Sequence, residues 1–291
     1  MSAPTIVTPH VLRDWPLPSP GSSKGSRGRV LVVGGARRTP GAALLAGRAA
    51  LRVGAGVLTF AVASSVAVQV AVAVPEAGTV GLAENAAGSV TGDDLALLDS
   101  DLSGADAVLV GPGLDDADLA EVLLRGLLPR IPDGVPVVLD AFALGVLDRL
   151  GDAAGAVAGR LILTPNQAEA HRLLGQDPES DVEPDLAEVA RRYGAVVYCQ
   201  QSMVNPAGER WEGSSGHGGL GTSGSGDVLA GAVCGLLARG ASLEQAACWA
   251  GHLHATAGDR LAIEVGPLGF LAGELADRLP LVMAELAGSR S

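Results

Sequence analysis

The chain has 291 residues, with 20 Lys and Arg against 32 Asp and Glu, a formal net charge of −12. This acidic balance argues against nucleic acid and an anionic membrane as main partners, but not against nucleotides, which local N–H groups bind. The three cysteines, Cys199, Cys234 and Cys248, have no metal-binding or C-x-x-C spacing. They indicate reduced core residues of a cytoplasmic protein.

The first residues differ from the rest of the chain. Residues 1–24 contain five prolines and predict a flexible N-terminal arm, followed by one α/β domain over 25–291. The apolar run 57–74 is interrupted by Ser64, Ser65 and Gln69. We therefore interpret it as a strand followed by a helix, and not as a membrane span.

Strands and helices alternate along the chain. Helices are predicted from Pro40 to near Gly54, over 64–74 and over 116–128, and again from Leu243 with a break at Gly266 and Pro267. The expected strands are 29–35, 57–62, 107–113, the runs ending at Asp140 and Thr164, 194–199, and short pieces at 203–204 and 209–211. Residues 75–104 predict only a short helix. This order predicts a mostly parallel sheet with helices on both faces and ligands at the carboxyl ends of its strands.

A glycine-rich loop that leads into a buried helix occupies 214–240. The N–H groups of Gly224, Ser225 and Gly226 are expected to bind an anion, because a helix N-terminus offers unpaired N–H groups and a positive dipole end. Asp227 follows them directly. A carboxylate beside a phosphate site suits a base that takes the proton of an attacking hydroxyl, although an Asp here can also be a first-turn charge. His217, inside the loop, is a candidate ligand contact.

The segment LTPNQAE, 163–169, permits two interpretations. Thr164 and Gln167 can form a capping box, with Pro165 at the first helical position. Glu169 can hold a phosphate-bound Mg²⁺ through water.

No P-loop or dinucleotide fingerprint occurs in the chain. His252 and His254 point about 200° apart on a helix, so they cannot bind one metal together, and at least one of them is interpreted as a packed core residue.

Several segments together resemble one known family. GTSGSGDVLAG at 221–231 is similar to the signature of the ribokinase-like superfamily, in which the Asp after the last glycine is the catalytic base. The match narrows to the ADP-dependent NAD(P)H-hydrate dehydratases through the segments that begin at Lys24, Val110, Val138, Leu163 and His252. The resemblance covers nearly the whole chain from residue 24. It implies a three-layer ribokinase-like sandwich.

The resemblance also implies an activity. ADP would phosphorylate the C6 hydroxyl of hydrated NADH or NADPH, and loss of phosphate would return NAD(P)H, with AMP and phosphate as the other products. Mg²⁺ as cofactor and a homotetramer are implied too. By position, Asp227 would be the base and would line the hydrate pocket together with Ala42, Gly113 and Asn166. The implied nucleotide-binding residues are Gln200, Gln201, Ser202, Gly224, Ser225 and Gly226.

Two departures from the family pattern leave alternatives open. Asn166 stands where the family usually has His, and Gln200 and Gln201 replace the lysine and glycine of its nucleotide loop. Asn166 and Glu169 also match the Asn-x-x-Glu pattern of the superfamily's kinases. The alternatives are an ATP-dependent kinase of a small alcohol and a catalytically weak member that binds a nucleotide.

Overall fold

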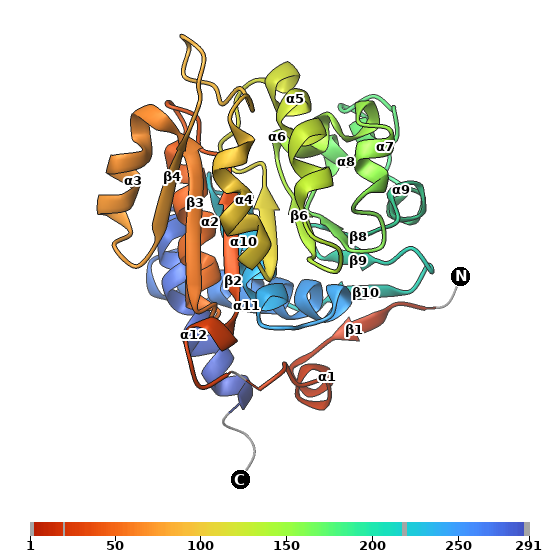
Figure 1. The fold of residues 1–291 in the computed structure, drawn as a ribbon. Coiled ribbons are helices and arrows are strands. Elements are labelled where there is room, and N and C mark those ends of the chain that lie inside the picture. Colours follow the sequence, from red (N-terminus) through yellow and green to blue (C-terminus); the bar gives the residue numbers. More distant parts are fainter. Residues whose placement is uncertain (1–2, 20, 217–219, 288–291) are drawn as a thin grey trace.

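The structure, a computed structural model, describes residues 3–19, 21–216 and 220–287. A ten-stranded sheet forms its middle layer, with helices on both faces (Figure 1). The strands are β1 Thr5–Val7, β2 Arg29–Val33, β3 Val57–Ala63, β4 Gly78–Leu82, β5 Ala107–Val110, β6 Val137–Leu139, β7 Leu161–Leu163, β8 Ala195–Cys199, β9 Ser202–Val204 and β10 Arg210–Gly213. The helices are α1 Pro9–Asp14, α2 Pro40–Arg52, α3 Ala67–Ala73, α4 Asp99–Gly104, α5 Ala117–Leu127, α6 Phe142–Gly145, α7 Asp152–Gly155, α8 Gln167–Leu173, α9 Leu186–Tyr193, α10 Ser225–Ala238, α11 Leu243–Glu264 and α12 Ala272–Ala287.

The sheet is mostly parallel, as predicted. Its strand order is β1-β10-β9-β8-β7-β6-β5-β2-β3-β4, and only β9 runs against its neighbours. The chain leaves β2, the third strand from the β4 edge, first toward β3 and β4 and then toward β5 on its other side. The carboxyl ends of β2 and β5 therefore border the crevice in which ligands of open α/β sheets bind.

Alternate residues of each strand enter two separate cores. Val30 and Val32 of β2 pack into the layer made by α2, α10, α11 and α12. Leu31 and Val33 pack into the opposite layer, made by α4, α5, α6, α8 and α9. Because side chains alternate across a strand, a sheet covered on both faces needs continuous apolar runs, and these strands have them. The predicted three-layer sandwich is confirmed.

The prediction of a flexible arm is wrong for residues 5–17. β1 pairs in parallel with β10, and Leu12 of α1 is fully buried. The indole N–H of Trp249 donates to the Trp15 carbonyl at 2.9 Å, and the Gln245 amide donates to the carbonyl oxygens of Trp15 and Pro16. The prolines terminate α1 and shape an extended segment that α11 holds, so their number did not signal disorder.

The edge strand β4 was not predicted. Its sequence, GTVGL, has two glycines and no alternating pattern, so local propensity gave no strand signal. Pairing with β3 over residues 59–63 imposes the strand. The 3₁₀ turn Leu95–Leu98 and α4 occupy the short helix expected in the same region.

Candidate active site

Two glycines bring α2 and α10 into backbone contact. A Cβ on Gly231 would lie 2.0 Å from the carbonyl oxygen of Ala46, and one on Gly235 would lie 2.7 Å from that of Ala50. The residue numbers of the two contacting pairs increase in the same direction along both helices. The helices therefore run parallel, and both begin at the same edge of the sheet. One turn earlier, this pairing puts Asp227 level with Ala42.

The first turns of both helices lie at the carboxyl edge of the strands. A Cβ on Gly28, just before β2 begins, would lie 2.1 Å from the carbonyl oxygen of Ala238 at the end of α10. The opposite end of α10, with Asp227, therefore lies toward the carboxyl ends. On the same edge, the Gly35 N–H donates to Pro112 and the Ala36 N–H donates to Gly113, joining the turns after β2 and β5.

Gly113 is required by its backbone conformation and by its surroundings. Its φ is +77°, and a Cβ there would lie 2.3 Å from the carbonyl oxygen of Thr39. Thr39 also donates its hydroxyl to the Gly113 carbonyl at 2.7 Å, immediately before α2 begins. The structure thus brings Gly113 and the first turn of α2 together, as the predicted site requires.

Asp227 occupies the first turn of α10, but it does not cap the helix. The N-cap residue is Gly224, which has a left-handed conformation and no side chain. The Asp227 carboxylate makes no hydrogen bond or ion pair with the described residues. Partial burial raises the pKa of Asp227 to about 6. The side chain is therefore a half-buried carboxylate that none of the described residues binds, and it is mostly ionised at neutral pH.

The anion-binding turn differs in one respect from the prediction. The backbone N–H of Ser225 already donates to the Thr222 carbonyl at 3.2 Å, so it is not free for a ligand. The N–H groups of Gly226 and Asp227 find no acceptor among the described residues. A Cβ on Gly226 would meet nothing within 4 Å, so open space adjoins this residue. Gly226 is the best-placed backbone donor of the three predicted residues.

A second carboxylate, Asp140, lies near Asp227. It follows β6, is buried, and accepts a hydrogen bond from the Thr164 hydroxyl at 2.9 Å. Burial and the charges of Asp227 and Glu169 raise the pKa of Asp140 to about 7, although the Thr164 bond opposes the shift. Ala141 follows in a conformation that favours glycine, φ 50° and ψ −125°, and its N–H hydrogen-bonds the Asp140 carboxylate. Its position after a predicted strand was the only signal for Asp140.

Asn166 and Glu169 form the capping box of α8. Asn166 Oδ1 accepts the Glu169 N–H, and Glu169 Oε2 accepts the Asn166 N–H, both at 2.9 Å. The predicted box of Thr164 and Gln167 is wrong, because the helix begins at Gln167 and Thr164 binds Asp140 instead. Burial raises the pKa of Glu169. One Glu169 oxygen is thus committed to the cap, which leaves the other for a water-mediated contact.

Gln200, Gln201 and Ser202 lie at the carboxyl end of β8, on the same edge of the sheet. Gln200 and Gln201 form the two-residue turn between β8 and β9, and Gln200 has a φ of +57°. The Gln201 amide oxygen lies 2.0 Å from where a Cβ on Gly213 would be, and its nitrogen 2.6 Å from one on Gly216. Gln201 therefore packs against the start of the glycine-rich loop. Three strand spacings, roughly 14 Å, separate β8 from β5.

The two histidines of α11 are both buried, which confirms the prediction that at least one of them is a packed core residue. The imidazole Nε2 of His254 lies 2.9 Å from the Ser225 hydroxyl and 3.0 Å from the Ser225 carbonyl oxygen. Among the described residues, the hydrogen-bond partner of His252 is the Thr256 hydroxyl, at 3.4 Å. The contact between His254 and α10 was missed, because the sequence gave no signal that joins residues 29 positions apart. His217 lies outside the described residues.

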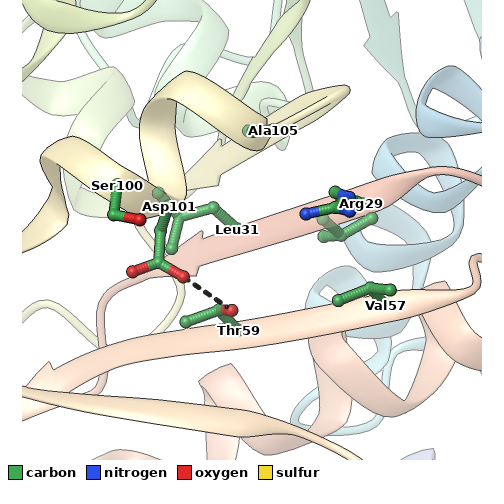
Figure 2. A pocket seen from close by; sticks show the side chains of 9 residues that line it. Arg29, Leu31, Val57, Thr59, Ser100, Asp101 and Ala105 are labelled. Atoms are coloured by element: carbon green, nitrogen blue, oxygen red, sulfur yellow. Dashed lines mark hydrogen bonds between the residues drawn. The ribbon is translucent and has the colours of Figure 1, made fainter. Parts of the chain in front are cut away.

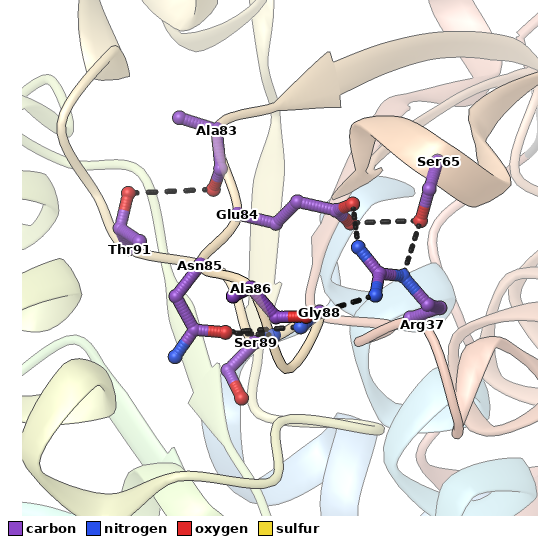
Figure 3. Close-up of polar contacts among 9 residues, drawn as sticks. All are labelled: Arg37, Ser65, Ala83, Glu84, Asn85, Ala86, Gly88, Ser89 and Thr91. Atoms are coloured by element: carbon purple, nitrogen blue, oxygen red, sulfur yellow. Dashed lines mark hydrogen bonds and ion pairs between the residues drawn. The ribbon is translucent and has the colours of Figure 1, made fainter.

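Arg37, which follows β2, fixes the loop 83–91 above the same edge (Figure 3). Its guanidinium pairs with Glu84 at 2.5 Å, and it also donates to the Ser65 hydroxyl and the Ala86 carbonyl. The Arg37 bond is the largest cause of the lowered pKa of Glu84. The Ser65 hydroxyl donates to Glu84 as well, and the backbone N–H of Arg37 donates to the Gly88 carbonyl, so the guanidinium is one of several groups that hold this loop.

The small hollow of about 120 Å³ in Figure 2 is not part of this site. It lies where β2 and β3 begin, between Arg29, Val57 and Asp101, and Thr59 donates to Asp101 there at 3.0 Å. The carboxyl edge of the sheet, which carries Asp227, is the opposite edge. In the described part of the chain, no three His, Cys, Asp or Glu residues are grouped to hold a metal ion.

The sheet, the glycine turns and the unpaired Asp227 define a ribokinase-like α/β enzyme. Fold comparison agrees, since a ribokinase-like superfamily protein of Enterococcus faecalis V583 superposes with a TM-score of 0.84 at 24% identity, covering 97% of this chain and 96% of that one. A profile described as NAD(P)H-hydrate dehydratase matches residues 30–281. The chain belongs to this family.

Two relatives are similar over almost their whole length. The ADP-dependent (S)-NAD(P)H-hydrate dehydratase of Xanthomonas campestris pv. campestris is 41% identical, over 98% of this chain and 99% of that protein. The ADP/ATP-dependent NAD(P)H-hydrate dehydratase of Bacillus subtilis, co-crystallised with ATP and Mg²⁺, is 26% identical with a TM-score of 0.77, covering 98% and 99% of the two chains.

Proposed function

We propose that this protein catalyses the ADP-dependent dehydration of hydrated NADH and NADPH. Its relatives are named for this reaction. The observation that carries the proposal is Asp227, a half-buried carboxylate in the first turn of α10. Neither its side chain nor the neighbouring N–H of Gly226 is bound by a residue within 3–19, 21–216 or 220–287. A base and an anion-binding turn at one point suit the transfer of a phosphoryl group to a hydroxyl.

In the proposed reaction, Asp227 accepts the proton of the C6 hydroxyl while that oxygen attacks the β-phosphorus of ADP. The bond to the AMP oxygen breaks, and the N–H groups at the start of α10 stabilise the negative charge on the transferring group. The lone pair of the ring nitrogen then expels phosphate from C6, and loss of a proton from C5 restores the C5–C6 double bond of the dihydronicotinamide. One hydrate and one ADP give NAD(P)H, AMP and phosphate. Ala42, Gly113 and Asn166 are proposed to border the hydrate.

The nucleotide is proposed to lie between α10 and the turn of Gln200 and Gln201, with Ser202 at its end. This turn carries no lysine, so neutral amides would replace a positive charge there. Mg²⁺ fits as an ion bound mainly by the phosphates and water, since the described residues form no protein cage for it. Bound in this way, it would neutralise phosphate charge, and the free oxygen of Glu169 would contact it through water.

The direct test follows the absorbance of reduced nicotinamide while purified protein, Mg²⁺ and a hydrate mixture receive ADP, or ATP in a parallel cuvette. A rise with ADP is expected. A rise with ATP alone keeps the reaction and changes the donor. Flat traces from folded protein would overturn the proposal and favour the kinase or the binding protein.

The role of Asp227 has its own test. Asp227→Asn keeps the size of the side chain and removes the base, so turnover should fall by about 10³-fold or more with nucleotide affinity retained. A variant with near-normal rate would contradict the assignment of the base.

We also propose a homotetramer located in the cytoplasm. All three cysteines are free and buried, which suits a reducing compartment. None of the helices in the described part of the chain has the length and apolar character that crossing a bilayer needs. Sedimentation velocity of the purified protein tests the assembly, for which a species near four times 29.0 kDa is expected.

A further inference from the structure

His254 holds the first peptide group of α10. The side chain is 6% exposed, and burial lowers its pKa to about 4, so the imidazole is neutral at physiological pH. A neutral imidazole carries a single N–H. Its Nε2 lies 3.0 Å from the Ser225 carbonyl oxygen, which can only accept a hydrogen bond. We therefore assign the proton to Nε2, since this tautomer makes the contact with the carbonyl a hydrogen bond.

This tautomer fixes the remaining contact. Because Nε2 carries the proton, it cannot accept from the Ser225 hydroxyl at 2.9 Å, and the hydroxyl oxygen must also accept from it. One N–H thus binds both oxygens of Ser225. The Ser225 side chain and its carbonyl are held from the α11 side by a group that cannot change its donor role.

The carbonyl contact sets the direction of the next N–H. In a trans peptide, the carbonyl of Ser225 and the N–H of Gly226 point in opposite directions. With the carbonyl oxygen bound to buried His254, the Gly226 N–H is directed away from α11. Gly226 has no side chain to restrain it and borders open space, so apart from His254 this peptide is restrained only at the end of the helical ladder, where the Ser225 carbonyl faces the Leu229 N–H.

We propose that His254 is a positioning residue, which orients the Gly226 N–H toward the phosphoryl group transferred in the reaction. The inference rests on the proposed function. It assigns a catalytic consequence to a side chain that lies 27 residues after Asp227 and does not touch the substrate. Misorienting one donor at a developing charge should lower the rate of transfer and leave substrate binding nearly intact.

The test compares two neighbouring histidines. His254→Met removes the N–H and keeps a similar apolar volume, and it should lower kcat by about ten- to hundred-fold with the KM for the hydrate within about twofold. His254→Gln can place an amide N–H near the position of Nε2, and it should recover kcat to within about threefold of the original. His252→Met is the matched control, because His252 is 7% exposed, lies on the same helix, and forms its hydrogen bond with Thr256 of that helix instead of with α10. It should keep kcat.

Amide hydrogen exchange gives a readout apart from activity. The segment 222–228 should exchange faster in His254→Met than in His252→Met or His254→Gln. If the Met variant does not fold, His254→Asn replaces it. The Asn side chain is one methylene shorter than that of Gln, so its amide falls short of Ser225. Equal losses in the two Met variants, or a Gln variant no better than Met, would overturn the role of His254. Absence of dehydration by the original protein would instead refute the proposed function.

Discussion

Gly231→Ala tests the backbone contact that aligns α2 with α10. The new Cβ would lie 2.0 Å from the Ala46 carbonyl oxygen and 2.6 Å from its Cα, and both atoms belong to the backbone of α2. Relief requires the helices to separate by roughly 1 Å, since Cβ contacts below 3.0 Å do not occur. Such overpacking costs about 1–3 kcal/mol, and the gain in helix propensity from Gly to Ala offsets about 1 kcal/mol at most.

The expected net loss is about 1–2 kcal/mol in the free energy of unfolding, measured by urea titration with circular dichroism. Since the same separation moves Ala42 away from Asp227, the KM for the hydrate should rise as well. Gly41→Ala, in the first turn of α2, is the stability control, because its Cβ would meet nothing within 4 Å. It should leave stability unchanged or slightly increased. A Gly231→Ala protein as stable as the Gly41→Ala protein would refute the reasoning.

Four further predictions follow from the same contacts. Because the pKa of Asp227 is raised to about 6 and the base acts when ionised, kcat/KM should fall about tenfold per pH unit below pH 6; a flat profile down to pH 5 would contradict this. The pKa of Asp140, raised from 3.8 to about 7, means that the folded state binds more protons between these values, so this group costs stability as pH rises through that window. Asp140→Asn should therefore raise the free energy of unfolding by about 1–3 kcal/mol at pH 8 and change it little at pH 4. If the variant and the original protein had equal urea midpoints at both pH values, this explanation would be wrong. Deleting residues 1–17 removes β1 and the fully buried Leu12, and should lower the free energy of unfolding by at least about 3 kcal/mol in urea; an unchanged midpoint would mean that the arm is dispensable. Arg37→Ala should speed amide exchange of the loop 83–91 about tenfold or more while the urea midpoint moves little, because the partly exposed ion pair contributes little to global stability.

The sequence by itself determined the layers of this protein and the point at which its chemistry is proposed. Continuous apolar runs, such as the one before Gly34, identify the strands, because a strand covered on both faces needs them. The helices between the strands are identified by apolar residues at helical spacing. Asp227 could be located because a glycine-rich loop and a buried helix adjoin it in the chain. Chemistry that depends on neighbours in sequence is visible in sequence.

Tertiary structure decided the features that depend on long-range contacts. The N-terminal arm folds because Trp249 and Gln245 bind its carbonyl groups from more than 200 residues away, which no local composition reveals. The N-cap of α8 is Asn166 and not the predicted Thr164, because the Thr164 hydroxyl donates its hydrogen bond to buried Asp140. The contact of His254 with Ser225 depends on α11 crossing the start of α10. Each outcome is a choice among partners that only the packed chain brings within hydrogen-bonding distance, and local propensity is too weak to specify it.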